Sequence, residues 1–138
     1  MSTVENFFDV YRCMKKPSQL PTVSDWHFFK DGIRPFWEDE ENKKGGKWII
    51  RVKKGVADRY WEDLLFALIG EQFGEAGEEV CGAVVSARNG EDVFSIWTKN
   101  DGGRNVKIRY VWLNRYYTSG VHMRTSCIAI VGSSQRLT

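Results

Sequence analysis

Two stretches of the 138-residue chain place apolar side chains at helical spacing. The first spans residues 3–15 and carries Val4, Phe7, Phe8, Tyr11 and Met14, behind a Ser-x-x-Glu capping pattern at residues 2–5. The second repeats every three or four positions through Trp61, Leu64, Leu65, Leu68 and Ile69. Two amphipathic helices are therefore predicted. We expect Asp58 to cap the start of the second and Gly70 or Gly74 to end it.

Three further stretches are rich in β-branched and aromatic residues, which favours strands over residues 47–52, 80–87 and 93–98. Asn89-Gly90 lies between the last two and is typical of a tight hairpin turn. Residues 22–46 show no period and are expected to form a long connection. Residues 106–112 alternate like a strand, although their basic residues also suit a helix start, and residues 128–131 suit a short strand or an apolar stub. The pattern predicts an α+β domain, an antiparallel sheet with helices packed on one face.

Composition narrows the class of protein. The chain is 42% hydrophobic and 28% charged, which is typical of one globular domain. Residues up to Thr98 include 13 basic and 17 acidic side chains, whereas those from Lys99 onward include 7 basic and 1 acidic. The basic end favours anionic partners or serves only for solubility.

Several classes of protein lack support in the sequence. The cysteines Cys13, Cys81 and Cys127 form no metal-binding or redox spacing, and neither a signal peptide nor a membrane-spanning run is visible. An intracellular protein without metal or cofactor is expected. No nucleophile motif or phosphate-binding loop occurs, so we do not expect an enzyme. The acidic run at residues 38–41 offers a catalytic carboxylate pair or, more simply, a solvated loop.

One pair of neighbours suggests binding of a nucleobase. In Trp37-Glu38 an indole precedes a carboxylate, and a carboxylate accepts two parallel N–H bonds from the edge of guanine. The indole would stack on the base, more strongly where methylation at N7 makes it cationic. Trp97 offers a further aromatic wall, while Lys47 and Arg88 suit phosphates. Alternatively, Trp37 is a buried anchor beneath its loop.

Longer segments carry a family resemblance. They read DWHFFKDGIRPFWED at residues 25–39, NKKGGKW at 42–48, WEDLL at 61–65, ALIGE at 67–71, VCGAVV at 80–85 and IWT at 96–98. In order and spacing they resemble the eukaryotic translation initiation factor 4E family, which binds the 5′ cap of mRNA. The likeness covers residues 3–109. The turn at residues 88–92, with Val93 where the main class has a phosphate-binding Lys, resembles the second, novel cap-binding class.

The resemblance implies a fold and a set of roles. A curved antiparallel sheet would carry helices on its convex face. Trp37, Glu38 and Trp97 would hold 7-methylguanine, and Lys47 and Arg88 would face the triphosphate. A monomeric cytoplasmic factor in translation initiation or its repression is implied. Scaffold or repressor proteins with a Y-x-x-x-x-L-φ motif would bind the helical side; the matching positions there are Val4, Phe8, Glu62 and Phe66. Phe8 replaces a Trp and Glu62 a Leu of the main class.

Two departures qualify this expectation. The family has further strands, with the other aromatic of the base sandwich, before the first helix. We therefore expect residues 1–109 to be an N-terminally truncated, partial cap-binding domain. Residues 110–138 do not resemble the family and are expected to form a divergent, poorly ordered basic tail. Two alternatives follow: an isoform that lacks cap binding and acts only as a peptide-binding module, or a nonfunctional splice or gene-model product.

Overall fold

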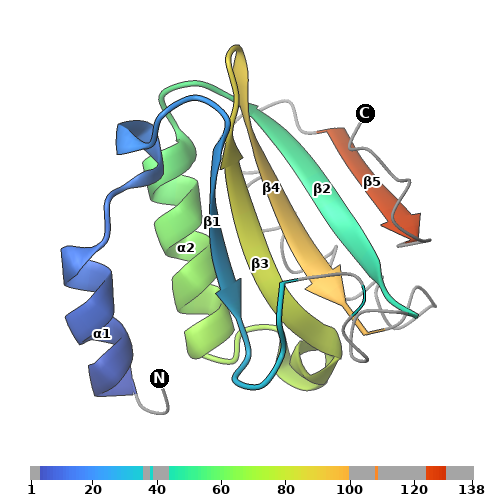
Figure 1. Ribbon diagram of the computed structural model, residues 1–138. Coiled ribbons are helices and arrows are strands. Elements are labelled where there is room, and N and C mark those ends of the chain that lie inside the picture. The colour runs from blue at the N-terminus through green and yellow to red at the C-terminus, as the bar shows by residue number, and fades with distance from the viewer. Residues whose placement is uncertain (1–3, 36–37, 39–43, 100–107, 109–123, 130–138) are drawn as a thin grey trace.

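The strands form a single curved sheet, and the helices pack on one of its faces. The computed structural model describes residues 4–35, 38, 44–99 and 108, together with the backbone of 124–129. In chain order, its elements are α1 (Val4–Cys13), the 3-10 turn η1 (Pro17–Gln19), β1 (Ser24–Phe29), β2 (Gly46–Lys53), α2 (Ala57–Ile69), the 3-10 helix η2 (Gly74–Glu79), β3 (Val80–Ala87), β4 (Glu91–Thr98) and β5 (Arg124–Ala129). The strands lie in the order β1-β3-β4-β2-β5, and every neighbouring pair is antiparallel (Figure 1). The predicted class, an antiparallel sheet with helices on one face, is confirmed.

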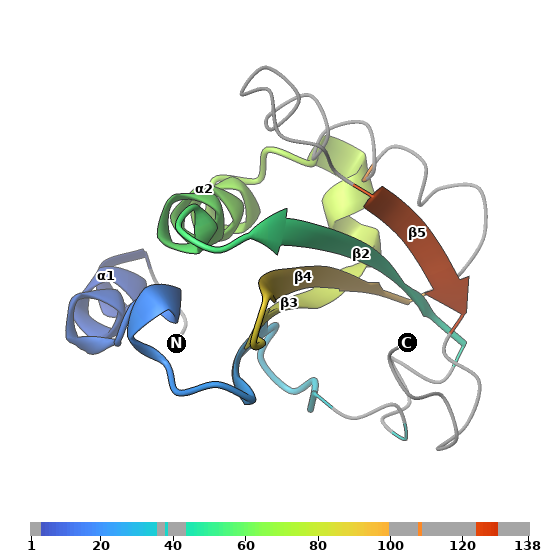
Figure 2. The ribbon, with the colours of Figure 1, turned by 90° about the horizontal axis from the view of Figure 1, so that it is seen from above.

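Alternation along the strands divides the sheet into two faces. Trp48, Ile50, Val85, Phe94 and Ile96 are buried in the same core cluster as the apolar stripe of α2. Figure 2 shows α2 lying against one side of the sheet. The ring centroids of Trp61 and Phe94 lie 6.4 Å apart at this contact. We call this side the helix face. Its burial is the main apolar contribution to stability, because each fully buried large side chain contributes about 1.5–3 kcal/mol.

The side chains between these positions form the opposite side, which we call the distal face. Register pairs place Phe29, Gly82, Trp97 and Lys47 in one row across four strands. A second row, four residues away along each strand, holds Asp25, Ser86, Val93 and Arg51. Both rows contain charged groups, so the distal face carries the polar chemistry of the sheet.

The largest disagreement with the sequence prediction is β1, which lies inside the stretch expected to be a connection. Its residues alternate, with Trp26 and Phe28 packing against the helix-face core and Asp25 and His27 on the other side. Trp26 also donates from its indole Nε1 to the carbonyl oxygen of Lys15 at 3.0 Å. The strand is short and mixes acidic, basic and aromatic side chains, so its period of two is weak until β3 is placed beside it.

The ends of α2 correct one prediction and confirm another. Asp58 does not cap the helix, because Val56 holds the N-cap position. The Asp58 carboxylate lies in the first turn instead and accepts from the Ser18 backbone N–H at 2.8 Å and from its hydroxyl at 2.6 Å. Asp58 therefore joins η1 to α2. The helix ends at Gly70, one of the two predicted positions.

The C-terminal predictions are tested only in part. Residue 108 is helical and buried in the core, but the rest of residues 106–112 lie outside the described residues, as do Ser2 and its capping pattern. β5 pairs with β2 from Gly46↔Ala129 to Arg51↔Arg124. Of the two options for residues 128–131, a strand is therefore correct for 128–129, and it begins earlier, at Arg124. The division at residue 109 stays a prediction. Neither described α-helix is long and apolar enough to cross a bilayer.

Candidate functional site

Trp97 lies at the centre of a row of side chains on the distal face. Phe29 of β1 is directly opposite Gly82 of β3, and Gly82 is directly opposite Trp97 of β4. The Phe29 and Trp97 rings meet edge to face, with centroids 5.4 Å apart and planes at 76°. Aromatic pairs favour this arrangement because the positive edge of one ring meets the negative face of the other. The indole thus has a defined neighbour on its β1 side.

Gly82 makes that contact possible. A Cβ built on it would lie 2.4 Å from Cγ of Phe29 and 2.6 Å from the carbonyl oxygen of Phe28. Both distances are far below a normal contact, so any side chain here displaces the Phe29 ring or the β1 backbone. The register between β3 and β4 also shifts between Val80 and Gly82, and such irregularities often re-aim a neighbouring side chain.

A lysine lies on the other side of the indole. Nζ of Lys47 on β2 is 5.4 Å from the centroid of the Trp97 ring, within range of a cation–π interaction. Burial lowers the pKa of the Lys47 amino group from its ordinary value. Both side chains remain partly exposed. Trp97 therefore holds a cation next to an accessible aromatic surface.

Arg88 occupies the hairpin end of the distal face. Its Nη1 donates to Oδ1 of Asp25 at 3.0 Å and to the carbonyl oxygen of Ala87 at 3.0 Å. The Arg88–Asp25 pair is partly exposed. A guanidinium in this position retains further N–H donors for an anion, because it has five in total.

The structure brings together some of the predicted cap-binding residues. Trp97 and Lys47 are in contact, and Arg88 lies at the far end of the same sheet face. Glu38 is exposed on a turn. Trp37 lies outside the described residues, so its part in the site stays a prediction. Phe29, Gly82 and Asp25 were missed by sequence reasoning, and only strand register reveals them.

The predicted peptide-binding residues lie on the helical side. Val4 and Phe8 of α1 are 51% and 36% exposed, and Phe66 of α2 is 37% exposed. The Phe8 and Phe66 ring centroids are 5.7 Å apart, and Tyr11 packs beside Phe66 at 5.9 Å. We call Val4, Phe8 and Phe66 the aromatic ridge. Glu62 lies one turn before Phe66 on α2 and is partly exposed. The pKa of Tyr11 is raised mainly by burial and further by the negative charges of Glu62 and Asp58.

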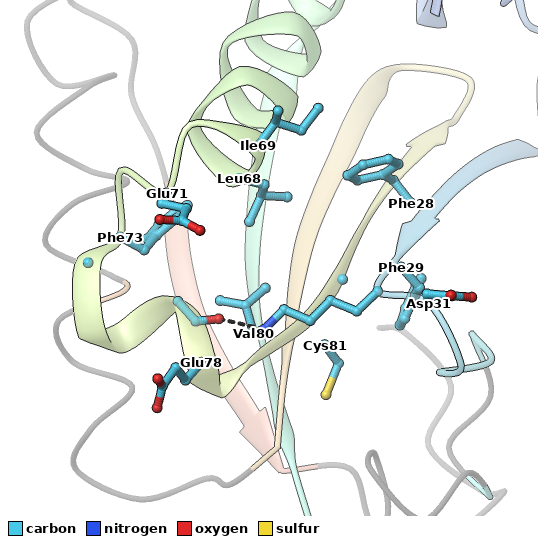
Figure 3. A pocket seen from close by; sticks show the side chains of 14 residues that line it. Phe28, Phe29, Asp31, Leu68, Ile69, Glu71, Phe73, Glu78, Val80 and Cys81 are labelled. Atoms are coloured by element: carbon cyan, nitrogen blue, oxygen red, sulfur yellow. Dashed lines mark hydrogen bonds between the residues drawn. The ribbon is translucent and has the colours of Figure 1, made fainter. Parts of the chain in front are cut away.

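A pocket of about 590 Å³ opens between the end of β1, the end of α2 and η2 (Figure 3). Phe28, Leu68, Phe73 and Val80 supply apolar walls. Nζ of Lys30 donates to the carbonyl oxygen of Gly77 at 2.7 Å, and burial is the main cause that lowers the pKa of Lys30. Phe29 lines this pocket, but none of the residues predicted to bind cap or peptide does. Within the described ranges, no three His, Cys, Asp or Glu residues are grouped to hold a metal ion.

Comparison with known proteins identifies the family. The sequence model of the family described as "Eukaryotic initiation factor 4E" matches residues 1–118. The chain belongs to the eukaryotic initiation factor 4E family. It is 53% identical over 100 residues to eukaryotic translation initiation factor 4E-4 of Caenorhabditis elegans, covering 72% of this chain and 47% of the relative. It is 50% identical over 135 residues to eukaryotic translation initiation factor NCBP of Triticum aestivum, covering 89% of this chain and 58% of the relative.

Solved 4E structures share the fold. The complex of Ascaris suum eIF4E-3 with m7G cap superimposes with a TM-score of 0.84 at 38% identity, over 99% of this 4E chain and 78% of that one. The complex of C. elegans eIF4E-3 with the 4E-binding protein Mextli and a cap analog gives 0.81 at 37% identity, over 90% and 73%. The chain spans about half the length of the curated relatives it matches.

Proposed function

We propose that this 4E chain binds the 7-methylguanosine 5′ cap of mRNA through its distal face. One observation carries the proposal: the partly exposed Trp97 indole already holds a cation, Nζ of Lys47, at 5.4 Å. Guanine methylated at N7 is itself cationic, and its methyl group would use the same electron-rich ring. Cap binding by the A. suum relative supports this assignment.

The remaining contacts follow from the same chemistry. Trp37 would stack on the base, and the Glu38 carboxylate would accept its N–H edge. When the cationic base reaches Trp97, Lys47 is repelled from the ring and becomes free to pair with the phosphates. Arg88 would contact them as well. The chain would act without catalysis, as a cytoplasmic factor in translation initiation or its repression.

Binding of 7-methyl-GTP measured against GTP tests this function. Unmodified chain should prefer the methylated nucleotide, and Trp97→Ala should lose about 1–3 kcal/mol, roughly 5- to 150-fold, mostly from the methylated ligand. Arg59→Gln, on the exposed side of α2, serves as a control variant that should bind both ligands normally. Equal affinity of the unmodified chain for GTP and 7-methyl-GTP would refute the proposal.

A second candidate function rests on the aromatic ridge. All three side chains are exposed, although Phe8 and Phe66 also touch the buried ring of Phe7. Exposed apolar groups of this kind favour a protein partner. We propose that the ridge binds an amphipathic Y-x-x-x-x-L-φ helix, as a 4E-binding protein of this motif class would present. The complex of C. elegans eIF4E-3 with the 4E-binding protein Mextli supports a partner of this kind.

Peptide binding separates the two functions. Val4→Asp should abolish capture of a Y-x-x-x-x-L-φ peptide, whereas Trp37→Ala should preserve it. Val10→Asp is the matched control, because Val10 is also exposed on α1 but lies on another side of the helix. If Val4→Asp and Val10→Asp lose peptide affinity equally, binding at the ridge is contradicted.

A further inference from the structure

A second arginine faces the hairpin end of the distal face. Arg51 of β2 is directly opposite Val93 of β4, and Val93 is directly opposite Ser86 of β3. Ser86 in turn is opposite Asp25 of β1, the partner of Arg88. One guanidinium therefore lies toward each end of a row whose middle is made of small side chains.

Each arginine is already paired with one carboxylate. Nη1 of Arg51 donates to Oε1 of Glu91 at 2.6 Å, and the two side chains are 32% and 40% exposed. Arg88 is paired with Asp25 in the same manner. Partly exposed ion pairs such as these contribute little net stability, so an anion of higher charge can replace the carboxylate at low cost. A guanidinium also binds two phosphate oxygens at once.

The spacing of the two rows fits a nucleotide. Trp97 and Val93 are four residues apart along β4, which corresponds to about 14 Å at ~3.4 Å per residue. Asp25 and Arg51 lie three strand spacings apart, about 14 Å, and the long arginine side chains narrow this gap. A base at Trp97 can therefore extend a chain of phosphates toward Ser86 and Val93.

We propose that Arg51 is a second phosphate-binding residue, which holds a polyphosphate together with Arg88 while Glu91 is the internal anion that the ligand displaces. This inference rests on the proposed function for the placement of the base. Val93 has no charge, so the cation on this side of the row comes from β2. A monophosphate is too short to reach Arg51, whereas a triphosphate reaches it.

Titration with four nucleotides at constant ionic strength distinguishes the contribution of the base contact from that of the phosphate contact. The ligands are 7-methyl-GTP, 7-methyl-GMP, GTP and GMP. Arg51→Gln should lower affinity for both triphosphates about tenfold and leave both monophosphates within about twofold. Glu91→Gln should raise triphosphate affinity, because the competing carboxylate is lost. A damaged fold cannot produce a gain, so this variant guards against misfolding. Arg59→Gln removes the same charge on α2 and should change none of the four affinities.

The outcomes distinguish this inference from the proposed function. Equal loss of mono- and triphosphate affinity in Arg51→Gln, or no loss beyond that of Arg59→Gln, overturns the role of Arg51. A triphosphate-specific loss in Arg51→Gln supports it even when methylated and unmethylated ligands bind equally. In that last case the methyl-specific function fails while the phosphate site stands.

Discussion

Replacing Gly82 by alanine tests whether the Phe29–Trp97 contact depends on the missing side chain. The new Cβ would lie 2.4 Å from Cγ of Phe29 and 2.6 Å from the Phe28 carbonyl oxygen. The ring can rotate away, but the carbonyl belongs to the strand backbone, so β1 must shift as well. Overpacking of this type costs about 1–3 kcal/mol.

Thermal unfolding gives the first measurement. A loss of about 2 kcal/mol corresponds to a fall in Tm of about 6–10 °C for a domain of this size. Gly90→Ala is the matched control, because nothing lies within 4 Å of its added Cβ and its φ is not in the left-handed region. We expect Gly90→Ala to change the unfolding free energy by less than about 0.5 kcal/mol.

Ligand binding gives the second measurement. Loss of the edge-to-face contact, worth about 0.5–1.5 kcal/mol, should weaken 7-methyl-GTP binding by roughly 2- to 13-fold. The double variant Gly82→Ala/Phe29→Ala should recover part of the stability, since only the backbone clash remains. If the unfolding free energy of Gly82→Ala is within about 0.5 kcal/mol of that of the unmodified chain, the space around Gly82 is not as tight as the geometry implies and the reasoning fails.

Three further predictions concern single contacts. Ser18→Ala removes the hydroxyl bond to Asp58 and leaves the bond from the Ser18 backbone N–H in place, and chemical denaturation should show a loss of about 1 kcal/mol in unfolding free energy. Asp25→Asn should change the unfolding free energy by less than about 1 kcal/mol, because the Arg88 pair is partly exposed. Burial lowers the pKa of Lys47, so the unfolded state binds more protons between that pKa and 10.5. Stability relative to Lys47→Met should therefore rise with pH across this window, and a fall would contradict it.

The hairpin and the second helix were predictable because their signals are local. The turn between β3 and β4 lies at Asn89-Gly90 as predicted, and the Arg88 N–H donates to the Glu91 carbonyl there at 3.1 Å. Neither residue adopts the positive φ that usually favours Asn-Gly in such turns. The apolar stripe of α2 places Trp61, Leu64 and Leu65 on the buried side without reference to any distant residue. Such features depend on chain geometry within a few residues.

Which residues make up the distal face was harder to predict from the sequence, because it depends on pairing between strands that are distant along the chain. Phe29 and Gly82 are far apart in sequence, and only the β1–β3 register brings them together. A slip of one residue would turn Phe29 to the helix face and remove its contact with Trp97. Lys47 and Arg88 were predicted from charge type and resemblance, but neither signal indicates that Lys47 lies over the indole.

The two ends of the distal face differ in a way that would orient the nucleotide of the proposed function. At one end, Phe29 and Trp97 offer an apolar and electron-rich surface with one movable cation. At the other, Arg51 and Arg88 offer guanidinium groups whose carboxylate partners are exchangeable. A ligand bound in reverse would bring phosphates to the aromatic end and take a cationic base away from its π partner. It would therefore lose the cation–π interaction at one end and the phosphate–guanidinium bonds at the other. Under the proposed function we therefore expect the base at Trp97 and the phosphates at the hairpin, so variants at the two ends should affect different parts of the same ligand.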